Sequence, residues 1–143
     1  VPFLAEHVEW QGLSGETYPD RKKGGVFGIW ESPLEKPDYL VPQEYGCHMD
    51  TVWMKLKADD GSNALRITMS GRQPFHFSAV PYTPEELENA LHKEELPDPR
   101  RTVVSILAAM RGVGGIDSWG SDVEEAYRVS AEEDIDYEFM ISR

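Results

Sequence analysis

The sequence is poor in cysteine and in basic residues. A single cysteine, Cys47, stands among 143 residues, so no internal disulfide framework can form. Only 14 Lys and Arg oppose 26 Asp and Glu, which gives a formal net charge of −12. A chain this acidic lacks the basic surface that attracts nucleic acid or an anionic membrane, and we expect neither as a partner. No apolar run approaches the roughly 20 residues that span a bilayer.

Signatures of catalytic and metal sites are also missing. The four histidines, His7, His48, His76 and His92, show no ligand spacing, so we expect no metal site. Residues 112–117 do not complete the dinucleotide-binding pattern G-x-G-x-x-G, and no G-x-S-x-G nucleophile elbow occurs. Most acidic residues fall in clusters or on outward strand positions. This distribution is typical of solvated surface rather than of the paired carboxylates of a glycosidase.

The sequence does contain many short segments with strand-like patterns. Apolar and polar residues alternate most clearly over residues 135–142. Other predicted strands and apolar segments cover residues 3–10, 26–30, 51–57, 65–69, 75–79, 103–110 and 123–129. A hairpin turn is predicted at residues 59–62. Residues 83–86 form a capping box with proline at the first helical position, which predicts a short helix whose apolar face is Leu87, Ala90 and Leu91.

These patterns define a fold class. Roughly eight strands and one short helix, at spacings of about 8–12 residues, predict an all-β fold of the antiparallel β-sandwich kind. We expect residues 1–143 to form a single domain. Residues 103–110 are apolar on both faces, which predicts a central strand. Pro33, Pro37 and Pro42 exclude a regular helix from residues 31–46 and predict a proline-rich extended arm within the domain.

Residues 111–120 combine four glycines, an Asp-Ser pair and Trp119. Glycine at 114 and 115 lets another surface approach the backbone closely. A tryptophan displayed on such a loop offers a flat apolar face that suits a sugar ring, whereas the alternative is a core tryptophan that closes a tight turn. Asp117, followed by Ser118 in a turn, is expected to bind its own backbone amides. The residues alone leave both interpretations of the tryptophan open.

Five blocks of the sequence resemble, in the same order, the C-terminal region of glycoside hydrolase family 2 β-galactosidases, which some bacteria encode as a separate small chain. The blocks are VEWQGL at 8–13, ETYPDR at 16–21, PQE at 42–44 with Gly46, YTPEEL at 82–87 and GVGGIDSW at 112–119. They cover nearly the whole chain, and the second and fifth are the most specific. One departure is YGCH at residues 45–48, where the family commonly has Asn-Gly-Asn-Arg.

The resemblance implies a galactose-mutarotase-like supersandwich, of which this chain is the later part, and a non-catalytic role. The family hydrolyses terminal β-D-galactosides such as lactose with two glutamates of a (β/α)8 barrel, and the Mg and Na cofactors belong to that catalytic domain. We therefore expect no catalytic residue and no cofactor in this chain, and no activity from it alone. Trp119 matches the loop tryptophan that stacks on the +1 sugar, with Gly114, Gly115, Asp117 and Ser118 supporting the loop.

The expected partners are the barrel, the other domains of a bacterial parent enzyme, cytoplasmic or periplasmic, and a β-galactoside. A homo-oligomer that hides an unpaired sheet edge is a further expectation. Two alternatives stay open. The chain is either a stand-alone carbohydrate-binding module with a cleft lined by Trp119, or a structural docking piece in which residues 16–21 and 31–46 contact other domains. A mutarotase-like enzyme requires a converging His/Glu pair, which the sequence does not reveal.

Overall fold

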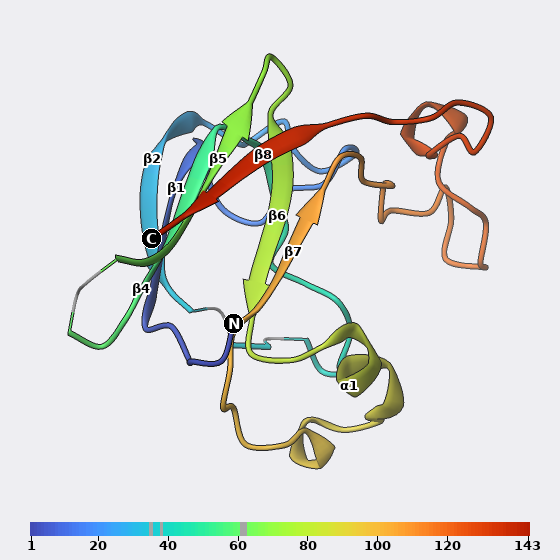
Figure 1. Cartoon of the computed structure of the whole chain (residues 1–143). Helices are drawn as coiled ribbons and strands as arrows, with labels where there is room; N and C mark the ends of the chain where they lie inside the picture. Colours follow the sequence, from blue (N-terminus) through green and yellow to red (C-terminus); the bar gives the residue numbers. More distant parts are fainter. Residues whose placement is uncertain (35, 38, 61–62) are drawn as a thin grey trace.

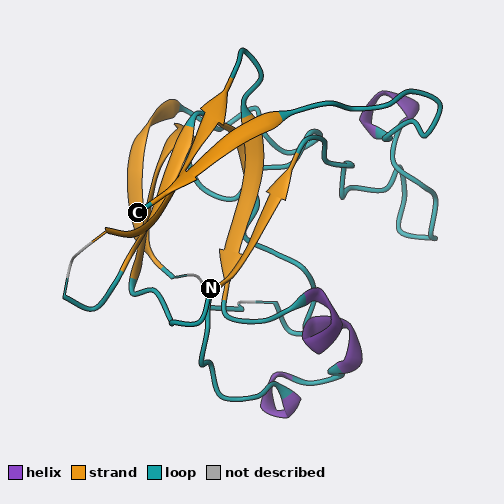
Figure 2. Ribbon diagram, viewed as in Figure 1, coloured by secondary structure: helices purple, strands orange, loops and turns teal. Residues whose placement is uncertain are grey.

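The protein is an antiparallel β-sandwich, seen here in a computed structural model that describes residues 1–34, 36–37, 39–60 and 63–143. Within these residues eight strands form a five-stranded and a three-stranded sheet (Figure 1, Figure 2). The larger sheet has the order β2-β1-β4-β5-β8, from β1 (His7–Leu13), β2 (Phe27–Pro33), β4 (Trp53–Lys57), β5 (Asn63–Ser70) and β8 (Glu138–Ser142). The smaller has the order β3-β6-β7, from β3 (His48–Thr51), β6 (Phe75–Val80) and β7 (Val103–Leu107). The expected all-β fold is confirmed.

The core lies between the two sheets and follows from the alternation of the strands. In β1, Val8 and Trp10 point inward and are 3 % exposed, while their neighbours face outward. Phe75 and Phe77 of β6 oppose them from the smaller sheet and are at most 1 % exposed. The remaining fully enclosed members of this cluster are Ala5, Met54, Leu56, Ile67 and Ala79. Burial of these side chains is the main favourable contribution to folding.

The short helix α1 (Pro84–Asn89) begins where the sequence predicts it. The Thr83 side chain accepts a hydrogen bond from the Glu86 amide at 3.2 Å, and the Glu86 carboxylate accepts one from the Thr83 amide at 2.8 Å. Leu87 and Ala90 are buried as expected, but Leu91 is 69 % exposed because the helix ends before it. Two 3-10 turns, at Lys93–Glu95 and Glu125–Tyr127, are the other helical elements of the described residues. None of the helices in these ranges has the length and apolar character needed to cross a membrane.

Residues 51–57, predicted as one strand, belong to two sheets. β3 ends at Thr51 and β4 starts at Trp53, with a bulge in β3 where Asp50 adopts a left-handed φ of 55°. The amide of Val52, between the strands, donates to the Gln11 carbonyl at 2.8 Å. The chain therefore crosses from one sheet to the other within three residues, which alternation alone does not reveal.

Two other strand predictions were wrong. Residues 103–110 do not form a central strand: β7 ends at Leu107 and lies at the edge of the three-stranded sheet. Its two apolar faces have different neighbours, because Val104 and Ile106 pack on the core while Val103 lies beside Tyr82 and Leu87. Residues 123–129 form no strand, since only Val123 is buried among them and the 3-10 turn occupies the middle.

The proline-rich arm begins inside a strand. Its first three residues are the end of β2, and the segment after Pro33 is irregular where it is described. Glu35 and Asp38 lie outside the described residues, as do Gly61 and Ser62 of the predicted hairpin turn. Tyr39 of the arm donates its hydroxyl to the Glu16 carboxylate at 3.2 Å, and the amide of Gly46 donates to the same carboxylate at 3.1 Å.

The connection between β7 and β8, residues 108–137, is the largest departure from the sandwich. It runs away from both sheets and returns as β8, which pairs with β5 (Figure 1, orange to red). The Tyr137 hydroxyl donates to the Ile106 carbonyl at 3.0 Å and fixes the return. The glycine-rich stretch lies in the first half of this excursion.

Candidate functional site

Trp119 lies on the excursion with its side chain open to solvent. It is 92 % exposed, and no residue from Val113 to Asp122 is buried. This exposure excludes the interpretation of Trp119 as a core residue of this chain. An open indole is unusual because large aromatic side chains normally pack inside. Both faces of the ring are available for stacking, and a role in sugar binding stays a prediction.

Asp117 shapes the turn that carries the indole. Its carboxylate accepts hydrogen bonds from the Trp119 amide at 2.8 Å and from the Ser121 hydroxyl at 2.7 Å. The Ser121 hydroxyl, followed by the Trp119 amide, lowers the pKa of Asp117 below its ordinary value. This is the local backbone bonding expected of Asp117 from the sequence. Gly120 completes the turn with a left-handed φ of 89°.

The carboxylate of Asp20 holds the start of the loop from 93 residues away. Its two oxygens accept hydrogen bonds from the amides of Val113 at 3.0 Å and Gly114 at 2.7 Å. Desolvation acts to raise the pKa of Asp20, but these two amides outweigh it, and the pKa lies below its ordinary value. A β-carbon on Gly114 would come within 2.8 Å of an Asp20 oxygen. Glycine is needed there because the backbone and the carboxylate approach so closely.

Gly115, predicted to support the loop, is restricted by the backbone of the loop itself. A β-carbon there would lie 2.7 Å from the Ser121 carbonyl oxygen. Ser118, the other predicted support, is exposed beside Trp119. The structure thus brings Gly114, Gly115, Asp117 and Ser118 into one compact turn around the base of the indole.

Further polar contacts join residues 111–112 to residues 122–128 within the excursion. The guanidinium of Arg111 pairs with the carboxylate of Asp122, and Arg128 approaches that carboxylate at 3.4 Å. The amide of Gly112 donates to the Tyr127 carbonyl at 2.8 Å. Polar contacts therefore shape residues 111–122, whereas burial of Val123 anchors the chain directly after them.

A cleft of about 670 Å³ opens beside the loop. The proline-rich arm contributes Gln43 to its wall, and the excursion contributes Arg111, Val113, Ser121 and Asp122. A larger groove of about 1,000 Å³ lies elsewhere, beside the N-terminal segment and Leu34. The smaller cleft is the better candidate site because it is lined by Gly115 and Gly120 of the loop that carries Trp119 and contains polar groups from two segments.

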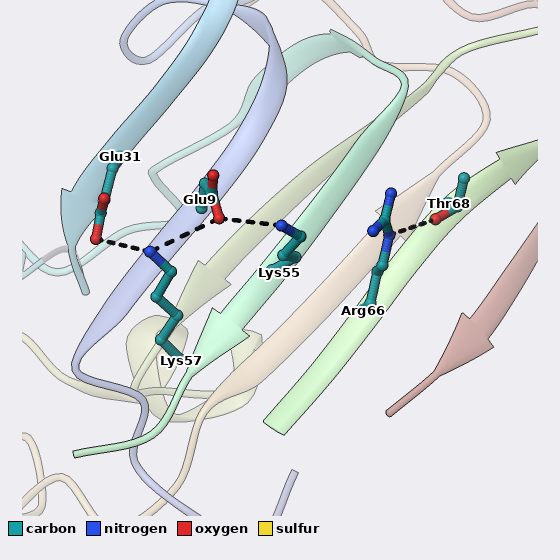
Figure 3. Close-up of polar contacts among 6 residues, drawn as sticks. All are labelled: Glu9, Glu31, Lys55, Lys57, Arg66 and Thr68. Atoms are coloured by element: carbon teal, nitrogen blue, oxygen red, sulfur yellow. Dashed lines mark hydrogen bonds and ion pairs between the residues drawn. The ribbon is translucent and has the colours of Figure 1, made fainter. Parts of the chain in front are cut away.

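The outer face of the five-stranded sheet carries the densest charge cluster. Glu9 of β1 lies 3.3 Å from Lys55 and 3.6 Å from Lys57 of β4, and Lys57 lies 3.1 Å from Glu31 of β2 (Figure 3). Arg66 of β5 donates to a neighbouring threonine on the same face. Each carboxylate is neutralised by lysine on an open sheet surface. This arrangement stabilises strand pairing and does not resemble an acid and a base facing a bound substrate.

Two of the histidines, His48 and His76, and the cysteine make structural contacts. His48 is 3 % exposed and stacks on Phe77 with ring centroids 5.0 Å apart. The ring of His76 accepts the Asp50 amide at 3.1 Å, and burial lowers its pKa. Burial raises the pKa of the Cys47 thiol to about 12. Across the described ranges no three His, Cys, Asp or Glu side chains gather closely enough to hold a metal ion.

Sequence reasoning missed the role of Asp20. The ETYPDR block that contains it and the glycine block were each recognised as specific, but nothing in their spacing indicates contact. Gln43 was missed in the same way, although it belongs to the PQE block. Neither residue could be placed at the site from the sequence, because the sequence does not show which of the distant blocks that carry the family resemblance lie together in the folded chain.

The fold and the site define a class: an all-β sandwich that bears an open aromatic side chain on a loop held by polar contacts. The family model described as "Beta galactosidase small chain" matches residues 1–141. The chain belongs to this family.

Individual relatives agree with the family assignment. The chain is 50 % identical over 152 aligned residues to a protein of Latilactobacillus sakei named "Beta-galactosidase small subunit", an alignment that covers 99 % of this chain and 48 % of that protein. It is 41 % identical to "Beta-galactosidase BgaC" of Bifidobacterium adolescentis, over 82 % of this chain and 11 % of that protein. It is 38 % identical to a "Beta-galactosidase" of Streptococcus thermophilus, over 88 % and 12 %. The chain thus spans half or less of the length of these relatives.

Proposed function

We propose that this chain is the small-chain portion of a β-galactosidase and that it completes, with Trp119, a substrate site whose reacting carboxylates belong to a catalytic barrel. Membership of the small-chain family supports the first part of the proposal. The second part rests on one observation above all: the indole at the position matching the family's loop tryptophan is 92 % exposed. An indole face buries the apolar C–H surface of a pyranose, a contact worth about 1–2 kcal/mol.

The proposed substrates are terminal β-D-galactosides such as lactose. The galactosyl residue is bound, and its glycosidic bond is cleaved, by the catalytic part, where the Mg and Na of the parent enzymes also belong. Trp119 contacts the sugar on the other side of the scissile bond. The proposal assigns binding and orientation to this chain, and the reacting acid and base to the barrel.

The test uses the β-galactosidase that contains this chain. Trp119→Ala is expected to raise the half-saturating concentration of lactose or of a glucose acceptor by about 5-fold to 30-fold, which corresponds to the lost stacking energy. Inhibition by galactose should change much less. Ile116→Ala is the matched control, since Ile116 is 68 % exposed in the same loop and presents no ring. Equal losses for galactose and glucose would refute the sugar contact.

A second measurement separates this proposal from a stand-alone binding module. The 143-residue chain alone is expected to hydrolyse no chromogenic galactoside and to give negligible heat in calorimetric titration with lactose. Robust turnover would contradict the non-catalytic role. Clear binding of lactose that is abolished by Trp119→Ala would favour the module instead.

The outer strands of the larger sheet are proposed to dock other domains of the parent enzyme. β2 presents Phe27 and Ile29, and β8 presents Met140 and Ile141, all more than half exposed. Apolar side chains on edge strands promote association unless they are covered. Light scattering distinguishes the partners: a self-associated chain indicates a homo-oligomer, whereas a monomer that associates only with the catalytic part supports domain docking.

A further inference from the structure

Asp20 lies on a segment that is fixed to the sandwich. The amide of Thr17 donates to the Cys47 carbonyl at 2.7 Å, and the Thr17 hydroxyl accepts the Met49 amide at 3.0 Å. Tyr18 is 8 % exposed and packs with Cys47 and Met49. Residues 17–20 therefore keep a constant position relative to β3, and the carboxylate of Asp20 is presented from a rigid base.

The loop that this carboxylate grips has no apolar anchor of its own. Val113 is 56 % exposed, Ile116 is 68 % exposed and Trp119 is 92 % exposed. Burial cannot fix the loop relative to the sheets when its large side chains face water. The two hydrogen bonds from the Val113 and Gly114 amides to Asp20, together with the Arg21 guanidinium that lies against Gly114, join this part of the loop to the sandwich.

The position of Gly114 at the start of the loop determines the position of Trp119 further along it. From Gly114 the chain enters the turn in which Asp117 binds the Trp119 amide and the Ser121 hydroxyl. Gly115 lies so near the Ser121 carbonyl that a β-carbon at position 115 would come within 2.7 Å of its oxygen. The turn is a compact unit, so its attachment point determines where the indole is held.

We propose that Asp20 is a positioning residue for Trp119: its bidentate carboxylate holds the glycine-rich loop at the orientation in which the indole meets the sugar. The kinetic consequence of this inference rests on the proposed function, whereas its structural consequence does not. Asp20 touches no substrate, and its effect passes entirely through the loop backbone.

The structural test measures the mobility of each indole in the 143-residue chain. Asp20→Asn keeps the shape of the side chain but turns one acceptor into an NH2 group that faces an amide N–H. We expect the {1H}-15N nuclear Overhauser effect of the Trp119 backbone amide and indole to fall in this variant. Trp10 and Trp30 are internal controls, because their indoles donate to the Leu13 and Gly12 carbonyls within the sheet. An unchanged Trp119 signal overturns the proposal.

The kinetic test is a double-mutant cycle in the β-galactosidase that contains the chain. Asp20→Asn is expected to raise the half-saturating concentration of a glucose acceptor about threefold to tenfold, the range for one lost hydrogen bond of ordinary strength. In a Trp119→Ala background the same substitution should change it less than about twofold, because the group through which it acts is gone. Asp136→Asn removes an equal charge from an exposed part of the excursion and should be neutral.

The two ideas fail in different ways. A full Asp20→Asn effect that persists in the Trp119→Ala background overturns the positioning role, even when Trp119 contacts sugar. A Trp119→Ala variant with an unchanged half-saturating concentration of the acceptor refutes the sugar contact. In that case a lowered nuclear Overhauser effect of Trp119 in Asp20→Asn still supports the role of Asp20 in holding the loop.

Discussion

The sandwich and the excursion between β7 and β8 are stabilised by different forces. The sandwich encloses Phe77 and Met54 completely and depends on buried apolar area. In the excursion Val123 is buried, but Val113, Ile116 and Trp119 are more than half exposed, and the loop that carries them is held by the carboxylates of Asp20 and Asp117. Charged groups near solvent contribute little stability but fix direction. The comparison teaches that substitutions in the two regions should affect different measurements, unfolding in one and ligand contact in the other.

The largest effect on stability is expected from Phe77→Ala. This side chain is fully buried between the sheets, and its removal leaves a cavity that the close-packed core cannot fill. The free energy of unfolding should fall by about 3–5 kcal/mol, measured by urea denaturation. Phe27→Ala is the control, because Phe27 is 53 % exposed and should change stability by less than about 1 kcal/mol. Similar losses at both positions would contradict the proposed core.

A smaller loss is expected from Thr102→Val. Thr102 is fully buried, and its hydroxyl accepts the Ala5 amide at 2.7 Å and donates to the Phe3 carbonyl at 3.0 Å. Valine keeps the shape but leaves both backbone groups unpaired, at a cost of about 1–3 kcal/mol in unfolding free energy. Ser118→Ala, a polar substitution on the exposed excursion, should be near neutral. Equal losses of unfolding free energy in Thr102→Val and Ser118→Ala would contradict the proposed difference between the sandwich and the excursion.

The pH dependence of stability should report on the sandwich through His76. Burial lowers the pKa of this ring, so at falling pH the unfolded chain takes up a proton before the folded chain does. The free energy of unfolding should therefore decline as the pH drops through about 6.5, the ordinary value of histidine. The loss is complete only below the lowered folded pKa. Denaturation curves between pH 7.5 and 5 should show a shallower decline in His76→Gln than in the parent chain, and equal slopes would exclude His76 as the cause.

The smallest effect on stability is expected from Trp119→Ala. Because the indole makes almost no contact with the rest of the chain, its removal should shift the unfolding free energy by less than about 0.5 kcal/mol. The same variant carries the largest expected effect on acceptor binding. A strong destabilisation in denaturation would mean that the indole packs inside, and the distinction between the two regions would disappear.

The sequence predicted the sandwich well because one-sided burial imposes alternation on strands such as β1 and β6. The alternation over residues 135–142 also predicted a strand, but β8 begins only at Glu138, and Met140 and Ile141 are both more than 60 % exposed. The sequence also located α1, since a capping box is a local signal. It failed where the deciding contact is distant. Residues 123–129 have strand-like composition but no neighbouring strand to pair with, and the crossing at Val52 depends on Gln11, 41 positions away.

The candidate site was only partly predictable for the same reason. Trp119 and its supporting turn are local, so glycine spacing and the family resemblance identified them. The contact between Asp20 and Gly114 spans 94 positions and has no local signature. The exposure of the indole could not be predicted either, because the residues that flank a buried tryptophan can be the same as those that flank an exposed one.

The open indole has one practical consequence. Trp10 is 3 % exposed, and Trp30 and Trp53 are each more than half buried, so Trp119 is the ring most fully in water. Its fluorescence should form a red-shifted component that iodide and acrylamide quench most readily. Any event that covers the ring, whether docking of a neighbouring domain or arrival of a saccharide, should shift that component to the blue. The chain thus carries a native optical probe at the place where its partners are expected to meet it.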